Sequence, residues 1–310
     1  MSQTYKSPIK YSWFIIVNPI AGNRNFSKQW RKIQQLLNNK KISFSFAFTQ
    51  FSKHEIKLVD IAIQQGFRNI ISIGGDGTLH HVVNGIMLQR YVKTSDISIA
   101  VIPLGTGNDW IKTYRIPNNL EKAVEIIHKK KTIFQDIGVL ETENNAISYF
   151  NNVAGLGYDG YIVNRLKSLK KLGKLSYLLA GIYGLFFYKK GIFEIIFNNK
   201  KLEENCLMIV FGICKFSGGG MQFTENVAIS NGLLDITILK NFTFFDLIFN
   251  LHKLYTAKIF QHKKIETFKT KQITVIPKKS NTFIQADGEI IGTGKVTVKI
   301  IKKGIRFIIK

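Results

Sequence analysis

Residues 69–85 read Asn-Ile-Ile-Ser-Ile-Gly-Gly-Asp-Gly-Thr-Leu-His-His-Val-Val-Asn-Gly. The apolar run at 69–73 predicts a buried strand, and the apolar residues after the glycines recur at helical spacing. A strand that ends in a glycine turn and opens a helix directs backbone N–H groups at one point, where a phosphate is attracted. Three glycines allow the backbone to approach such a ligand closely: Gly74, Gly75 and Gly77.

A carboxylate, that of Asp76, lies in the middle of this glycine turn. Phosphate repels a carboxylate unless a metal ion bridges the two, so the stretch predicts a nucleotide together with Mg²⁺. The alternative is a strand–turn–helix junction whose glycines serve only the turn.

A second turn of the same kind follows further along the chain. The apolar run 99–102 predicts another strand, and Pro103-Leu104-Gly105-Thr106-Gly107-Asn108-Asp109 comes directly after it. Ligands of open α/β sheets bind beyond the carboxyl ends of the strands. Both turns are therefore expected to face one cleft.

Composition limits the class of protein less sharply. The chain has 310 residues, is 45% hydrophobic and carries a formal net charge of +24. This length allows two domains with sizeable cores. The charge predicts attraction to anions, a class that includes nucleotides, nucleic acid and an acidic membrane surface. Cys206 and Cys214 lie in one apolar run and are interpreted as buried thiols of a protein in a reducing compartment.

The chain shows no sign of crossing a membrane. No signal peptide is apparent, and the longest apolar stretch, 175–188, is shorter than the roughly 20 residues that a spanning helix needs. We expect a cytoplasmic protein, peripheral at the inner membrane surface. Residues 161–190 combine helical apolar spacing with basic residues and no acid, and with 253–279 they are expected to dock on anionic lipid. The alternative is a core-packing helix with a solvated basic face.

Strand and helix signals alternate in the first part of the chain. Strands are expected at 11–17, 42–49, 69–73 and 99–102, and helices at 26–37, 54–65 and 120–128. This order predicts an α/β domain in which helices cover both faces of a parallel sheet.

Beyond residue 133 most segments read as strands, which predicts an antiparallel, β-rich second domain. Strands are expected at 147–153, 192–197, 206–213, 234–239, 273–276, 282–285 and 296–300, and helical insertions at 161–188 and 244–259. The predicted domains are 1–133 and 134–300. A last strand at 304–309 is expected to return to the first domain, which residues 301–310 would then complete.

Several motifs in a fixed order resemble those of the bacterial diacylglycerol kinase-like lipid kinases, which are related to sphingosine and ceramide kinases. The first are Asn18-Pro19-x-x-Gly22 and the two glycine turns; Asp136-Ile137-Gly138, Phe150-x-Asn152 and Gly155-x-Gly157-Tyr158-Asp159 follow. The last are Gly218-Gly219-Gly220-Met221, Asn231-Gly232-Leu233-Leu234-Asp235 and Asp287-Gly288-Glu289. The resemblance covers nearly the whole chain. The first glycine turn alone is shared with NAD kinases and 6-phosphofructokinases, whereas the full set is more specific.

The resemblance implies an ATP-dependent kinase that phosphorylates a lipid hydroxyl in a cleft between the two domains. Diacylglycerol, converted to phosphatidic acid, is the expected substrate. Residues at family positions that contact ATP are Asn18, Pro19, Gly22, Thr49, Gly74, Gly75, Asp76, Gly77, Thr78, Gly105 and Thr106. Those that correspond to Mg²⁺ and its water network are Asp76, Asp109 and Asp136, with Asn231 at a second, structural metal position.

The family's general base falls on Glu289. A carboxylate near the acceptor hydroxyl helps to remove its proton, because a lipid alcohol is a poor nucleophile. Asp287 is close enough in sequence to serve instead, and both are counted with Asp76 as candidate catalytic residues. The alternative reading of Asp287-Gly288 is an ordinary hairpin turn.

The sequence departs from the family pattern at three places. Asn231 stands where many relatives have an aspartate that binds a structural Mg²⁺, so that metal site is in doubt. His81 stands where a glutamate is common, and Phe223-Thr224-Glu225-Asn226 stands where the family usually has a proline.

Other functions remain open at this stage. A sphingoid-base or ceramide kinase differs only in its acceptor. An NAD kinase would normally carry an Asn-Glu pair where this chain has Asn108-Asp109. A non-enzymatic protein that binds lipid or nucleic acid would fit the charge, but it would leave the glycine turns unexplained, and no nucleic-acid motif is evident. The expected partners are a lipid substrate and an anionic membrane, without nucleic acid; a homodimer is left open.

Overall fold

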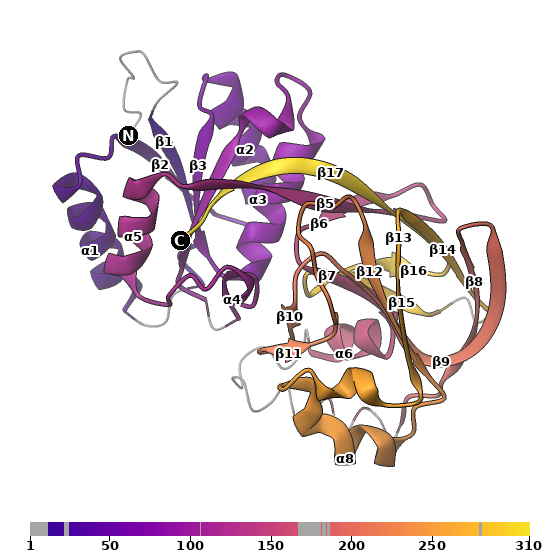
Figure 1. The fold of residues 1–310 in the computed structure, drawn as a ribbon. Helices are drawn as coiled ribbons and strands as arrows, with labels where there is room; N and C mark the ends of the chain where they lie inside the picture. Colours follow the sequence, from indigo (N-terminus) through magenta and orange to yellow (C-terminus); the bar gives the residue numbers. More distant parts are fainter. Residues whose placement is uncertain are drawn as a thin grey trace. The chain divides into compact units, whose positions relative to one another are not determined.

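Two compact units make up the fold in the computed structural model (Figure 1). The first comprises Met1–Gln135 with Lys303–Lys310, and the second comprises Asp136–Lys302. The structure describes residues 12–21, 25–105, 107–166, 181, 184, 187–278 and 281–310.

The first unit is built on a parallel sheet. Its strands are β1 (Trp13–Val17), β2 (Phe44–Phe48), β3 (Asn69–Gly74), β4 (Ser98–Pro103) and the end of β17 (Val296–Ile308). They lie in the order β2-β1-β3-β4-β17, and every neighbouring pair is parallel. The predicted parallel sheet is therefore confirmed.

Helices cover both faces of this sheet. They are α1 (Phe26–Asn39), α2 (His54–Gln64), α3 (Asp76–Leu88), α4 (Trp110–Thr113) and α5 (Leu120–Lys129), with a 3₁₀ turn, η2 (Thr94–Asp96). α1 lies beside α5 on one face, and α2 lies beside α3 on the other (Figure 1). Strands enclosed on both faces read as continuous apolar runs, which is why β1, β3 and β4 are recognisable in the sequence.

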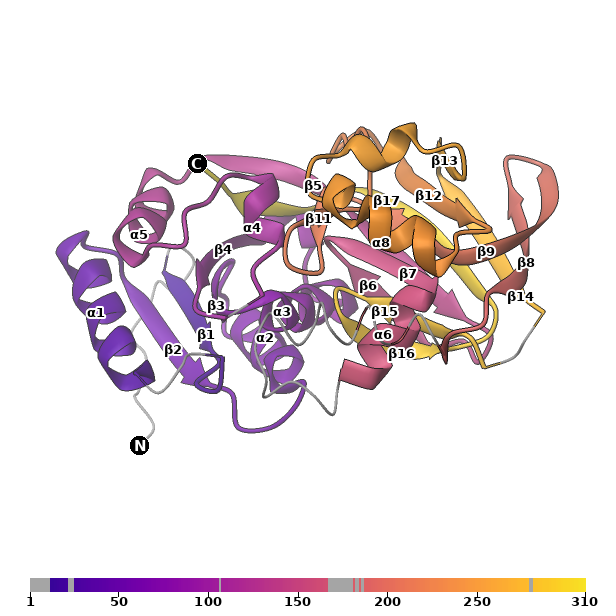
Figure 2. The same ribbon diagram turned by 90° about the horizontal axis from the view of Figure 1, so that it is seen from below.

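The second unit is mainly antiparallel. Its strands are β5 (Thr132–Thr142), β6 (Ile147–Phe150), β7 (Val153–Gly157), β8 (Gly191–Phe197), β9 (Lys200–Gly212), β10 (Phe216–Ser217), β11 (Met221–Gln222), β12 (Leu234–Lys240), β13 (Ile265–Thr270), β14 (Gln272–Pro277), β15 (Phe283–Ala286), β16 (Glu289–Thr293) and the first part of β17. Its helices are α6 (Tyr158–Leu166) and α8 (Phe244–Leu254), with a 3₁₀ turn, η4 (Lys258–Gln261). Figure 2 shows α6 beside β7 and β15.

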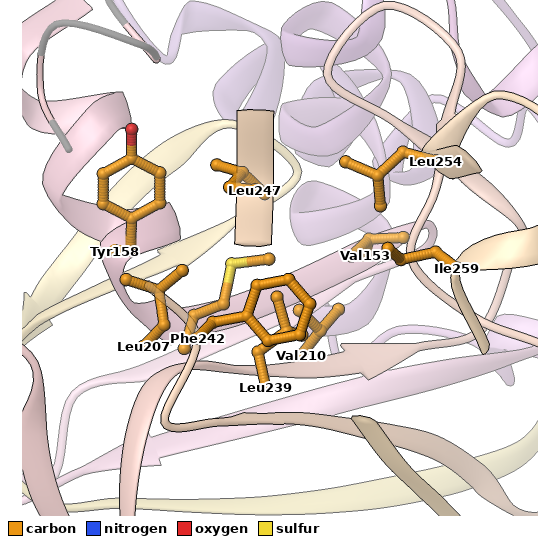
Figure 3. Packing of buried hydrophobic residues seen from close by; sticks show 10 residues of the cluster. Val153, Tyr158, Leu207, Val210, Leu239, Phe242, Leu247, Leu254 and Ile259 are labelled. Atoms are coloured by element: carbon orange, nitrogen blue, oxygen red, sulfur yellow. The ribbon is translucent and has the colours of Figure 1, made fainter. Parts of the chain in front are cut away.

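Strand β9 organises the sheet of this unit. Its first half pairs with β8, and its second half pairs with β7 on one side and β12 on the other. The second half is buried throughout. A hydrophobic cluster forms against it from β7, β9, β12 and α8 (Figure 3), with Leu207, Leu239 and Leu247 among its members.

Three sequence predictions need correction. The expected strand 147–153 is two strands, β6 and β7, separated by Asn151-Asn152. The expected strands 296–300 and 304–309 are one continuous strand, β17. The expected helix 244–259 ends at Leu254, and η4 follows it.

The expected helix 161–188 lies partly outside the described residues. The described helix α6 begins earlier, at Tyr158, and runs to Leu166. Residues 167–180, which carry most of the predicted basic face, lie outside the described residues.

Two expectations from composition can be compared with the structure. Cys206 and Cys214 are buried free thiols, as predicted. Within the described part of the chain, no helix combines the length and the apolar character that crossing a bilayer would need.

Candidate active site

The turns that follow β3 and β4 are in direct contact. The carbonyl oxygen of Gly74 accepts hydrogen bonds from the N–H groups of Leu104 (2.9 Å) and Gly105 (3.2 Å). In return, the N–H of Asp76 donates to the carbonyl of Gly107 at 3.1 Å. The two glycine turns therefore form one backbone surface at the carboxyl edge of the sheet, next to the first turn of α3.

Glycine is required here because the two backbones touch. A Cβ atom on Gly105 would lie 2.6 Å from the Cα of Gly75, and one on Gly75 would lie 3.0 Å from the Gly107 carbonyl oxygen. A Cβ on Gly74 would lie 2.3 Å from Oγ1 of Thr78. Side chains at these positions would separate the turns or displace the start of α3.

Gly105→Ala is expected to lower the free energy of unfolding of the first unit by about 1–3 kcal/mol, because the added methyl group overpacks the contact between the turns. Gly107→Ala is the matched control: its Cβ would meet only Oδ2 of Asp76, at 3.8 Å. All three tryptophans of the chain lie in the first unit, so fluorescence-monitored urea unfolding reports on that unit alone. Equal stability of the two variants would contradict the steric argument.

The carboxylate of Asp76 is held by the turn after β4. Its Oδ2 accepts the N–H of Asp109 at 2.7 Å, and its Oδ1 accepts the N–H of Trp110 at 3.2 Å. Asp109 is buried and forms a 2.6 Å ion pair with Lys112. Asp76 and Asp109, two of the predicted metal residues, are thus brought together.

The start of α4 is itself firmly anchored. The indole N–H of Trp110 donates to Gln135 at 3.0 Å, and the ring packs against Phe307 with centroids 4.7 Å apart. Because Trp110 also donates to Asp76, this packing helps to fix the direction of the carboxylate.

The turns after β1 and β2 lie at the same edge of the sheet. Asn18 donates from Nδ2 to Oγ1 of Thr78 at 3.0 Å, which links the β1 turn to the start of α3. The N–H of Thr49 donates to the carbonyl of Val17 at 2.9 Å. Pro19 follows Asn18 in the β1 turn, and Gly77 lies in the first turn of α3. Two further predicted nucleotide residues, Gly22 and Thr106, lie outside the described residues.

Asp136 and Asn231, the other predicted metal residues, belong to the second unit. Asp136 is buried, and its Oδ2 accepts the N–H of Gly232 at 2.6 Å. The side-chain oxygen of Asn231 accepts the N–H of Leu233 at 2.9 Å. Asp136 therefore holds the turn that carries Asn231. Across the described ranges, no three His, Cys, Asp or Glu side chains gather where they could hold a metal ion.

Asp287 and Gly288 form the two-residue turn between β15 and β16. Their φ angles are +50° and +83°, as a type I′ hairpin requires. The Asp287 carboxylate accepts backbone N–H groups at 3.0–3.2 Å from Asn151, Asn152 and Val153. These bonds explain why the chain breaks between β6 and β7, and they give Asp287 a structural role.

Glu289 begins β16, directly after this turn, and its side chain is half-buried. The turn is fixed from behind by Gln285, whose Oε1 accepts the N–H of Gly288 at 2.9 Å. Gln285 in turn donates from Nε2 to Oδ2 of Asp159 at 2.5 Å. The predicted site did not include Asp159 or Gln285. Asp159 belongs to the quoted Gly-x-Gly-x-Asp motif, but nothing local in the sequence connects it to position 285.

Burial raises the pKa of Asp159 to about 6, against the opposing effect of the Gln285 hydrogen bond. The unfolded chain releases this proton near pH 3.8. The folded state therefore loses relative stability as the pH rises from about 4 to about 6.

Asp159→Asn is expected to stabilise the protein by about 2 kcal/mol at pH 7.5 and to leave it unchanged near pH 4, because the amide mimics the protonated acid. Urea unfolding monitored by circular dichroism at the two pH values measures this difference. The same change in stability at both pH values would show that burial of the charge is not its cause.

Both units of the chain match models of known protein families. Residues 12–140 match the model of the diacylglycerol kinase catalytic domain. Residues 152–309, about half of the chain, match the model of the YegS C-terminal NAD kinase beta sandwich-like domain. The chain belongs to the YegS and diacylglycerol kinase family of lipid kinases.

Individual relatives agree with this family. The chain is 28% identical over 296 residues to the putative lipid kinase YtlR of Bacillus subtilis. The aligned residues make up 91% of this chain and 94% of YtlR. The chain is also 28% identical to the diacylglycerol kinase of B. subtilis over 73% of each chain. A crystal structure of a putative diacylglycerol kinase from Bacillus anthracis has the same fold, with a TM-score of 0.80, 22% identity, and coverage of 98% and 99% of the two chains.

Membership in a lipid kinase family gives the described surface a chemical meaning. Kinases transfer a phosphoryl group mainly by positioning it and offsetting its charge. The start of α3 lies at this edge, and the first N–H groups of a helix, which have no partner within the helix, suit phosphate oxygens. The chain is therefore a phosphotransferase.

Proposed function

We propose that this lipid kinase transfers the γ-phosphoryl group of ATP to the free hydroxyl of diacylglycerol and so produces phosphatidic acid. The observation that carries the proposal is the paired glycine turns, which fix the Asp76 carboxylate between two backbone donors beside the start of α3. A diacylglycerol presents one primary hydroxyl on an apolar body. The second unit would supply its binding surface.

The first unit would hold the nucleotide. Asn18, Thr49 and Thr78 would supply polar contacts, and the glycine turns would supply backbone N–H groups to the phosphates. Mg²⁺ fits Asp76 and Asp109, because this ion is usually held by one or two carboxylates together with substrate phosphates and water. Such a site needs no preformed cluster of three acidic groups. Bound Mg²⁺ would offset the negative charge of the transferring phosphoryl group.

The second unit would supply the base. In the proposed reaction Glu289 takes the proton from the acceptor hydroxyl. The oxygen of that hydroxyl bonds to the γ-phosphorus of ATP, and the bond between this phosphorus and the bridging oxygen of the leaving ADP breaks. Glu289 is favoured over Asp287, because the Asp287 carboxylate is directed at three backbone N–H groups of its own unit.

The test is phosphorylation of defined acceptors with radiolabelled ATP and Mg²⁺. Diacylglycerol, ceramide, sphingosine and NAD are supplied separately, and a total lipid extract is supplied as an unbiased mixture. Labelled phosphatidic acid as the main product would support the proposal. Preferential labelling of a sphingoid base or ceramide would show that this lipid, and not diacylglycerol, is the substrate. Labelling of NAD alone would contradict lipid phosphorylation.

A further inference from the structure

Helix α8 is held in one orientation on the second unit. A capping box fixes its start: Oγ1 of Thr243 accepts the N–H of Asp246 at 3.2 Å, and Asp246 accepts the N–H of Thr243 at 2.8 Å. Its inner face carries Leu247 and Leu254, which are buried in the hydrophobic cluster of this unit (Figure 3). The opposite face is therefore presented outward by the packing itself.

That outward face carries three large apolar side chains beside the exposed His252. Phe245, Ile248 and Phe249 recur at helical spacing of three and four, and 65%, 36% and 71% of their surfaces are exposed. The two phenylalanine rings stack with centroids 6.3 Å apart. Tyr255, the residue at the C-cap of the helix, is 48% exposed. Large apolar side chains gathered on one exposed face mark an interaction surface rather than scattered surface residues.

The segment that carries this stripe is rich in lysine. Residues 242–265 contain four lysines, Lys253, Lys258, Lys263 and Lys264, and one acidic residue, Asp246. Asp246 is offset by its ion pair with Lys264. Burial lowers the pKa of His262, and Lys253, Lys263 and Lys264 all lie near enough to it for their positive charges to lower that pKa further. The lysine at the end of α8 and the lysines after η4 are therefore close together.

We propose that Phe245, Ile248, Phe249 and Tyr255, here called the α8 face, insert into the headgroup region of an anionic bilayer, with Lys253, Lys258 and Lys263 binding its acidic lipids. An apolar helix face flanked by basic residues has the composition of an interfacial helix. The inference rests on the proposed function, because a membrane lipid as acceptor requires the enzyme to work at a bilayer surface.

Charge favours a bilayer over a second copy of the chain. A symmetric pairing of two α8 faces would bring two sets of lysines together, whereas acidic headgroups provide the opposite charge. The stripe is also too short for a span, which agrees with insertion only to the depth of the headgroups.

Binding is tested with vesicles of phosphatidylcholine and with vesicles of equal parts phosphatidylcholine and phosphatidylglycerol. The wild type is expected to sediment with the anionic vesicles, and Phe245→Ser/Phe249→Ser to bind them about tenfold or more weakly, because two exposed rings no longer enter the bilayer. Ile147→Ser/Ile192→Ser is the matched control, since it removes two exposed apolar side chains from strands β6 and β8. Lys253→Gln/Lys258→Gln/Lys263→Gln should remove the preference for anionic vesicles.

Activity separates this inference from the proposed function. The phenylalanine variant should retain wild-type turnover of a water-soluble short-chain diacylglycerol and lose turnover of long-chain diacylglycerol in anionic vesicles. Wild-type failure on both substrates would remove the proposed function. Wild-type vesicle binding by the phenylalanine variant would overturn the role of the α8 face. A wild-type dimer that this variant converts to a monomer would instead make the face a subunit interface.

Discussion

Asp76→Asn is expected to lower turnover by about 10³-fold, because it removes a preorganised charge from the proposed phosphate site. Its structural cost should be smaller. Asp76 accepts N–H groups from Asp109 and Trp110, and an amide would turn its own NH₂ toward one of these donors. An unsatisfied buried donor costs about 1–3 kcal/mol, so some loss of stability should accompany the loss of activity.

Two measurements separate these effects: steady-state release of ADP, and urea unfolding followed by tryptophan fluorescence. Asp96→Asn is the control, because it removes an exposed carboxylate from η2 of the same unit. Turnover close to that of the wild type in the Asp76 variant would exclude this carboxylate from the transfer step. If the Asp76 variant lost activity only at urea concentrations that unfold the first unit, the Asp76 carboxylate would have a structural role.

Glu289→Gln is expected to lower turnover by about 10²–10⁴-fold, the usual contribution of a general base. ATP affinity should not change, because the nucleotide is assigned to the first unit and Glu289 belongs to the second. Steady-state release of ADP measures turnover, and equilibrium binding of ATP measures the affinity.

Asp287→Asn is the informative comparison for Glu289→Gln. Its carboxylate accepts three backbone N–H groups between β6 and β7, so its loss should lower the free energy of unfolding by about 1.5–3 kcal/mol or more. Glu289→Gln should leave stability almost unchanged. A normal melting temperature together with lost turnover in the Asp287 variant would transfer the role of base to Asp287.

Much of the first unit could be predicted because its signals are local. Strands β1, β3 and β4 are apolar runs enclosed on both faces, and the glycine turns follow β3 and β4 directly. The sequence also predicts that the two turns face the same edge of the sheet, because ligands of open α/β sheets bind beyond the carboxyl ends of the strands. What local patterns could not reveal is the steric demand at Gly105, which depends on Gly75 across the contact.

The second unit was harder to predict because distant residues shape it. The run 147–153 reads as one strand, and the break at Asn151-Asn152 comes from a carboxylate at position 287. The link between Asp159 and Gln285 likewise joins residues far apart in the sequence. At 302–304 the two lysines and a glycine suggest a gap between strands, yet β17 continues through them, with Lys303 at φ +52°.

The end of β17 places a constraint on the order of biosynthesis. Arg306 and Phe307 pair with Ser98 and Ile99 of β4, so a strand translated after the β-rich unit closes an edge of the sheet that β1–β4 begin. During translation, that edge stays uncovered until the ribosome has released residue 307. The α/β unit is therefore finished after the whole β-rich unit has emerged, although its own sequence begins first.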